Sequence, residues 1–128
     1  MRKNYIFIPG AMTLIMLLIC TSCSILAPKE LGATGNYECN AGYLVEGSAL
    51  CNVELANNDK FDWHGVTLTI NDDYTYSLKI PVIKSGTVYM ANLANFILSN
   101  GTRFDIRSTK PLNVEVTSKE GIYYGVWN

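Results

Sequence analysis

The chain has 128 residues, of which 48% are apolar and 16% are charged, so an intrinsically disordered chain is excluded. The formal net charge is −1 and no basic cluster is present in the sequence, which argues against nucleic-acid binding by phosphate neutralisation. This length suits one small domain rather than two.

The first 22 residues have the pattern of a removable secretion signal. Arg2 and Lys3 supply a short positive region. The apolar core over residues 11–19 is about as long as a signal h-region and too short to span a membrane comfortably. Removal of the signal leaves 128 − 22 = 106 residues with 8 basic and 11 acidic side chains, and hence a net charge of −3.

Residues 19–24, with the sequence ICTSCS, end this signal. They resemble the lipobox of bacterial lipoproteins, in which small residues precede a cysteine that is acylated and becomes the new N-terminus. Cys23 fits this pattern best because two small residues precede it, whereas Cys20 follows the bulky Ile19. An ordinary cleaved signal and an N-terminal membrane helix are the alternatives, and each would leave an unmodified cysteine next to the signal.

The resemblance implies that Cys23 carries fatty acid, such as palmitate, and anchors the protein to a membrane. Ser24 follows this cysteine, and the family pattern then implies the outer membrane of the bacterial envelope. Residues 23–35 contain one proline and two glycines and are expected to form a tether, with residues 36–128 as a single β domain. We expect this domain to face the periplasm.

Cys39 and Cys51 remain as a pair once Cys20 is removed and Cys23 is modified. Export implies an oxidising compartment, so we expect a disulfide between them. Closure of this short loop would stabilise the fold by roughly 3 kcal/mol. A metal–thiolate site or a redox pair is less favoured, because these two cysteines lack Cys-x-x-Cys spacing.

The segment Tyr37-Glu38-Cys39 resembles the early Tyr-x-Cys motif of the c-type lysozyme inhibitors of Gram-negative envelopes. The second cysteine of that family lies near its C-terminus, whereas Cys51 is close by here. The resemblance implies a small barrel that inserts a hairpin loop into the lysozyme cleft. It also implies that residues 99–102 form that loop.

Alternation of apolar and polar residues dominates the sequence from Tyr37 onward. Residues 66–70 and 74–80 alternate and are separated by three polar residues, which predicts a hairpin with one apolar face. Pro81 cannot donate to a strand ladder and therefore predicts a strand end or an edge strand. Residues 48–55 are a plausible earlier strand.

Residues 87–98 fit two patterns. Apolar residues at helical spacing predict a helix that starts after Thr87, whereas the polar residues around Leu93 break the segment into two strands. We favour two strands, because a hairpin at Asn100-Gly101 needs a strand before it. This dipeptide is the preferred pair for a type I′ turn.

Later strands are predicted over residues 103–107, 112–116 and 122–127, with a turn at 119–121. The total is about eight short strands joined by turns, which predicts an all-β antiparallel meander closed as a small barrel or sandwich. The alternative is an α+β fold with one helix near residues 87–98.

His64 is the one histidine of the sequence, and Asp62 lies on the same side of a candidate strand, with Asp59 nearby. These residues could form a metal site or an acid–base pair. We favour a polar surface set, because a metal site needs three or four ligands. No motif for a catalytic nucleophile or a phosphate cradle is present in the sequence, so we expect neither catalysis nor a cofactor.

Tyr123, Tyr124 and Trp127 place rings on both sides of the last predicted strand. Such a strand is either central in a closed structure or presents one face to a partner, and Tyr and Trp are favoured at interfaces. The candidate binding residues are therefore Ser99, Asn100, Gly101, Tyr123 and Trp127.

The predicted interior also has aromatic residues, which could fill a barrel or hold a small apolar ligand. The rings concerned belong to Tyr74, Tyr76, Phe96 and Phe104. We expect a module that binds or inhibits another protein, either of the envelope or from outside the cell. The alternatives are an assembly accessory of a secretion or pilus system, such as a pilotin, and a carrier of a small apolar ligand.

Overall fold

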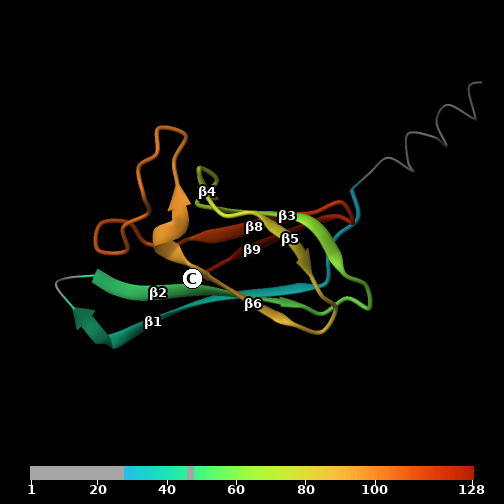
Figure 1. The fold of residues 1–128 in the computed structure, drawn as a ribbon, viewed down its shortest axis with the longest axis horizontal. Coiled ribbons are helices and arrows are strands. Elements are labelled where there is room, and N and C mark those ends of the chain that lie inside the picture. Colours follow the sequence, from blue (N-terminus) through green and yellow to red (C-terminus); the bar gives the residue numbers. More distant parts are fainter. Residues whose placement is uncertain (1–27, 46–47) are drawn as a thin grey trace, which may run out of the picture.

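The computed structural model describes residues 28–45 and 48–128, and Figure 1 shows their arrangement. These residues form nine β-strands and one short 3₁₀ helix, which confirms the predicted all-β fold. No helix among them is long and apolar enough to cross a membrane. The predicted signal over residues 1–22 and the candidate lipidation site Cys23 lie outside the described residues.

One sheet has three antiparallel strands in the order β1 (Ala33–Val45), β2 (Ser48–Asn57) and β6 (Val88–Asn92). The central strand β2 buries alternate residues, namely Cys51, Val53 and Leu55. This period of two gives the strand one buried face. The register of β1 on β2 sets Cys39 opposite Cys51, where the two cysteines form the predicted disulfide.

The second sheet has six strands, and β3 pairs with β8 on one side and with both β4 and β5 on the other. Alternate residues of β3 and β8 are buried, among them Leu68, Ile70, Val114 and Val116. The strands are β3 (Trp63–Ile70), β4 (Tyr74–Tyr76), β5 (Ile80–Ile83), β7 (Phe96–Ile97), β8 (Asn113–Thr117) and β9 (Ile122–Val126).

The two sheets face each other across one hydrophobic core (Figure 1). Trp63 and Phe96 are the largest fully buried side chains in this core. The indole N–H of Trp127 donates to the carbonyl of Gly35 at 2.8 Å and so links the end of β9 to β1 in the other sheet. This architecture agrees with the predicted barrel or sandwich.

The segment 87–98 forms two strands, as predicted, and the alternative of a helix near residues 87–98 is wrong. The 3₁₀ helix η1 (Leu93–Asn95) separates β6 from β7. The Asn92 side chain accepts a hydrogen bond from the backbone N–H of Ala94, and Leu93 is buried. These contacts turn the chain from one sheet into the other.

Two predicted strands are shorter than the alternation suggested. Residues 77–79 interrupt the predicted strand 74–80, and Leu78 is exposed there. The strand predicted at 103–107 is reduced to an isolated bridge between Ile97 and Arg103. Local bonds compete with pairing in this segment, because the carbonyl of Asp105 accepts from the N–H groups of Ser108 and Thr109.

The type I′ turn lies in the first hairpin rather than in the second. Asn71 and Asp72 have φ angles of 51° and 65°, and the N–H of Asp73 donates to the carbonyl of Ile70. At residues 99–101, only Gly101 has a positive φ, of 86°. The predicted type I′ turn at Asn100-Gly101 is therefore wrong, and a three-residue loop with glycine in the left-handed region replaces it.

The folded domain begins before residue 36, where the tether was expected to end. Leu31 is only 3% exposed, and its N–H donates to the carbonyl of Ile122. The N–H of Ile122 donates to the carbonyl of Lys29, so residues 29–31 run parallel to the start of β9. Strand β1 then begins at Ala33.

Candidate functional site

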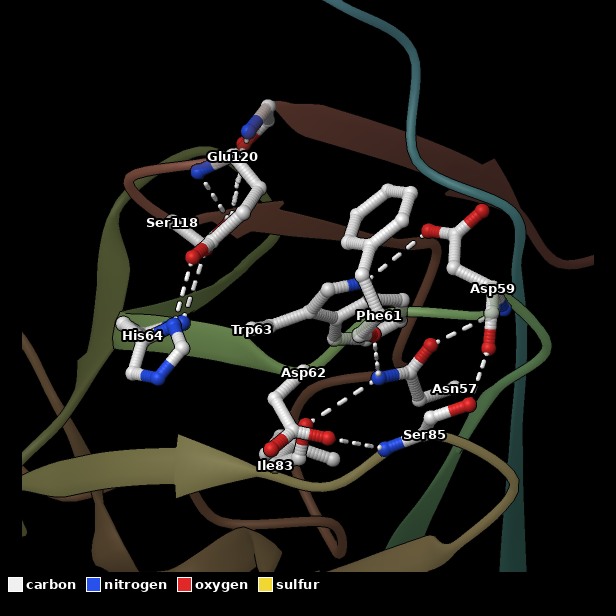
Figure 2. A network of polar contacts seen from close by, with 11 residues as sticks. Asn57, Asp59, Phe61, Asp62, Trp63, His64, Ile83, Ser85, Ser118 and Glu120 are labelled. Carbon is white, nitrogen blue, oxygen red and sulfur yellow. Dashed lines mark hydrogen bonds and ion pairs between the residues drawn. The ribbon is translucent and has the colours of Figure 1, made fainter.

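Polar side chains bind one another at the end of the domain where the described chain begins, which we call the entry end (residues 28–32, 58–62, 84–87 and 118–121) (Figure 2). The Asp59 carboxylate accepts hydrogen bonds from the Trp63 indole N–H at 2.9 Å and from the backbone N–H of Gly32 at 3.0 Å. Asp62 accepts from the backbone N–H of Ser85 at 2.9 Å. Both aspartates thus hold loops of the fold in place.

Within the described residues, His64 forms no hydrogen bond with either of these aspartates. It pairs with Glu120 in the turn between β8 and β9 (Figure 2). One oxygen of Glu120 accepts from the backbone N–H of His64 at 2.8 Å, and the other lies 2.5 Å from His64 Nδ1. The backbone hydrogen bond and then the side-chain hydrogen bond from His64 lower the pKa of Glu120 to about 2.

The hydrogen bonds of Asp59, Asp62 and His64 therefore link loops of the fold and have a structural role. In the described ranges, no group of three His, Cys, Asp or Glu side chains is arranged to hold a metal ion. Asn57 completes the network as a buried hub. Its amide N–H group donates to the carbonyls of Phe61 and Ile83, and its side-chain oxygen accepts from the N–H of Asp59.

The candidate binding residues Tyr123 and Trp127 lie on the inner side of β9 and its end, and both are half-buried. The Trp127 ring packs edge-on against Tyr37 with a centroid distance of 5.0 Å. The alternate residues face outward instead, since Tyr124 is 51% and Val126 is 66% exposed. The rings that the sequence singled out are thus placed mainly between the sheets.

The remaining candidate residues, Ser99, Asn100 and Gly101, are all exposed. They form the tip of the loop after β7, which projects sideways from the part of the domain remote from the entry end (Figure 1). We call residues 98–112 and the pocket beside them the far end. The N–H of Leu98 donates to the carbonyl of Thr102, and the Asn100 side chain accepts from the N–H of Thr102 at 2.9 Å. The tip is therefore exposed but internally bonded.

A pocket of about 320 Å³ opens beside this loop. Its apolar wall comes from Leu93, Phe104 and Ile106, and one half of the disulfide, Cys51, also lines it. Charged side chains complete the lining. These are Arg103, Asp105 and Arg107.

The two arginines of the pocket differ in their ion pairing. Asp105 binds the Arg107 guanidinium with both carboxylate oxygens, each at 3.0 Å, and these hydrogen bonds lower the pKa of Asp105. In the part of the chain that the structure describes, no hydrogen bond or ion pair engages the Arg103 side chain. The pocket thus combines an apolar wall with one unpaired positive charge.

The four interior aromatic residues pack against one another. Tyr74 contacts Phe104 and Tyr76 contacts Phe96, with ring centroids 5.0 and 5.1 Å apart. Burial, and then a hydrogen bond with Tyr76, raise the pKa of Tyr89 to about 12. These rings therefore fill the space between the sheets at this point.

Sequence reasoning missed the pocket and the partner of His64. Arg103 and Arg107 appeared as polar positions of the strand predicted over residues 103–107. That segment is irregular in the structure, and the fold brings it together with Leu93. Comparisons of the chain with protein-family models, curated proteins and solved structures found no match.

Proposed function

We propose that this chain is the globular part of a bacterial lipoprotein, anchored through Cys23 to the outer membrane and facing the periplasm. In this proposal the domain binds another protein, of the envelope or from outside the cell, and binding is its activity. An inhibitory action on that partner is the specific form that the Tyr37-Glu38-Cys39 resemblance suggests.

The position of the exposed loop carries this proposal. Ser99, Asn100 and Gly101 are exposed. Their loop after β7 projects from the part of the domain remote from residues 28–32, where the described chain begins (Figure 1). A domain held by its N-terminal side would present this loop away from the lipid. Its internal hydrogen bonds reduce the entropy that would be lost on binding.

Site-specific photo-crosslinking in intact cells tests the binding surface. A photoreactive residue at Asn100 is expected to capture a discrete partner protein, and the same residue at Lys60 of the entry end serves as the control. Identification of one partner from Asn100 would support the proposal. Adducts from Lys60 with none from Asn100 would contradict it.

The anchor is tested separately by intact mass spectrometry of the exported protein. Acylated Cys23 is expected as the N-terminal residue, and Cys23→Ser should abolish the acyl mass while Cys20→Ser leaves it. A bare thiol at Cys23, or an uncleaved signal, would remove the membrane from the proposal.

The inhibitory form is tested with a c-type lysozyme. Loss of lysozyme activity on addition of the protein, relieved by Asn100→Arg in the exposed loop, would support it. Lysozyme activity that the protein leaves unchanged would exclude this form and leave the crosslinking test to identify another partner.

A further inference from the structure

The chemistry of the pocket at the far end points to a class of ligand. Leu93, Phe104 and Ile106 offer apolar contact, and Cys51 of the disulfide also lines the pocket. Leu93 and Phe104 belong to the hydrophobic core and Ile106 packs against it, so this apolar surface is largely formed before any ligand arrives.

The volume limits the size of the occupant. About 320 Å³ lies at the lower end of the roughly 300–1,000 Å³ that small-molecule sites have. A single apolar group of the size of an amino-acid side chain suits this space better than a large cofactor.

The charged side chains of the pocket indicate which charge its ligand carries. Arg107 is engaged by Asp105, whereas the Arg103 guanidinium has no partner within residues 28–45 and 48–128. The three charged side chains leave a net charge of +1 at the pocket, which favours a singly charged anion. The Asp105 carboxylate would repel a more highly charged group such as a phosphate dianion.

We propose that this pocket binds an apolar group that carries one carboxylate, with the apolar part against Phe104 and the carboxylate on Arg103. A guanidinium presents parallel N–H donors that match a carboxylate. Two sources share this chemistry, a free apolar acid and the C-terminal residue of a protein chain. This inference rests on the proposed function, because it names the group that a bound partner would insert.

Fluorescence anisotropy with matched peptides tests the pocket. The probe is a labelled peptide that ends in phenylalanine with a free carboxylate, and the matched control is the same peptide with a C-terminal amide. The titrant is the exported protein in lipid nanodiscs, with empty nanodiscs as blank. The carboxylate form is expected to bind about five- to tenfold more tightly than the amide, the factor that roughly 1 kcal/mol of charge recognition gives.

Substitutions test whether the preference for the carboxylate peptide arises in the pocket. Arg103→Ala should remove the preference for the carboxylate, Arg103→Lys should keep part of it, and Lys60→Ala at the entry end should leave it unchanged. Competition by 3-phenylpropionate, but not by 3-phenylpropanol, would support a free acid as the source. Binding of the peptide without such competition would support a chain terminus.

Equal binding of the two peptides, equal effects of Arg103→Ala and Lys60→Ala, or no binding of either peptide would overturn the proposal. The crosslink from Asn100 separates this outcome from failure of the proposed function. A persistent crosslink without a carboxylate preference removes only the ligand class, whereas loss of the crosslink removes the binding surface itself.

Discussion

Asn57 shows how one polar side chain can hold an end of this domain together. It is 1% exposed, and its amide engages three backbone groups, at Phe61, Ile83 and Asp59. Removal of the amide would leave these groups without this partner, at a cost of about 1–3 kcal/mol for each that water does not reach.

We therefore expect Asn57→Ala to lower the free energy of unfolding by about 2–4 kcal/mol. Urea denaturation followed by fluorescence measures this loss. The neighbouring Asn58→Ala is the matched control, because Asn58 is exposed and donates one side-chain bond, to Thr34. Similar losses for the two variants would show that the hub is no stronger than a surface contact.

Glu120 makes stability depend on pH in a defined direction. Its pKa in the folded protein, about 2, lies below the ordinary value of 4.5 because of its hydrogen bonds from His64. The ionised carboxylate therefore stabilises the fold fully above about pH 4.5, and this contribution is lost as the pH falls toward 2.

The substitution Glu120→Gln should accordingly lower Tm near neutral pH, and the difference from the unchanged protein should shrink as the pH falls from about 5 to about 2. Thermal unfolding followed by circular dichroism over this range measures the trend. Glu38→Gln, which removes an exposed carboxylate of β1, is the control. A difference in Tm that stays constant with pH would refute the assignment to Glu120.

For individual residues, the sequence alone identified the two cysteines of the disulfide but only one member of the His64–Glu120 pair. His64 was singled out by its residue type, but its partner Glu120 lies 56 positions away and only the pairing of β3 with β8 brings the two together. The disulfide was predictable, because both of its members are cysteines and the export expected from the signal pattern favours a disulfide.

In the turn between β3 and β4, two adjacent residues share an unusual backbone conformation but differ in what their side chains do. Asn71 and Asp72 both have positive φ, but only Asn71 also holds a distant segment. Its side chain donates to the carbonyl of Lys110 at 2.9 Å and accepts from the N–H of Leu112 at 2.7 Å. These bonds fasten the loop that precedes β8.

Asp72→Gly should stabilise the domain by about 0.5–1 kcal/mol, because glycine adopts this conformation without strain. Asn71→Gly should instead destabilise it by about 1–2 kcal/mol, since the same backbone freedom comes with the loss of two hydrogen bonds. Chemical denaturation of both variants measures the contrast. Shifts of equal sign would mean that backbone strain alone governs this turn.

Sequence reasoning located well the two strands at the centre of the larger sheet. Alternation was reliable for β3 and β8, where the sheet buries every second residue. It failed over residues 77–79 and 103–107, where apolar and polar residues alternate but the chain forms no strand. Pro81 was informative, since it lies in β5, which pairs with β3 alone.

For the molecule as a whole, the Cys39–Cys51 bond joins the two long strands of the smaller sheet. Cys39→Ser is expected to lower the free energy of unfolding by about 2–5 kcal/mol. Denaturation without reductant measures the loss, and addition of reductant should destabilise the unchanged protein but not the variant. An unchanged Tm for the variant under non-reducing conditions would show that the bond adds nothing to stability.

The buried position of Leu31 has a consequence for how far the domain can travel. Five residues separate Cys23 from Lys29, which is already bonded to Ile122. A fully extended chain spans at most about 3.6 Å per residue, so a connecting segment of this length spans roughly 20 Å at most. If Cys23 is acylated as proposed, the domain stays within a thin layer above the lipid headgroups. A partner protein must then enter that layer to be bound.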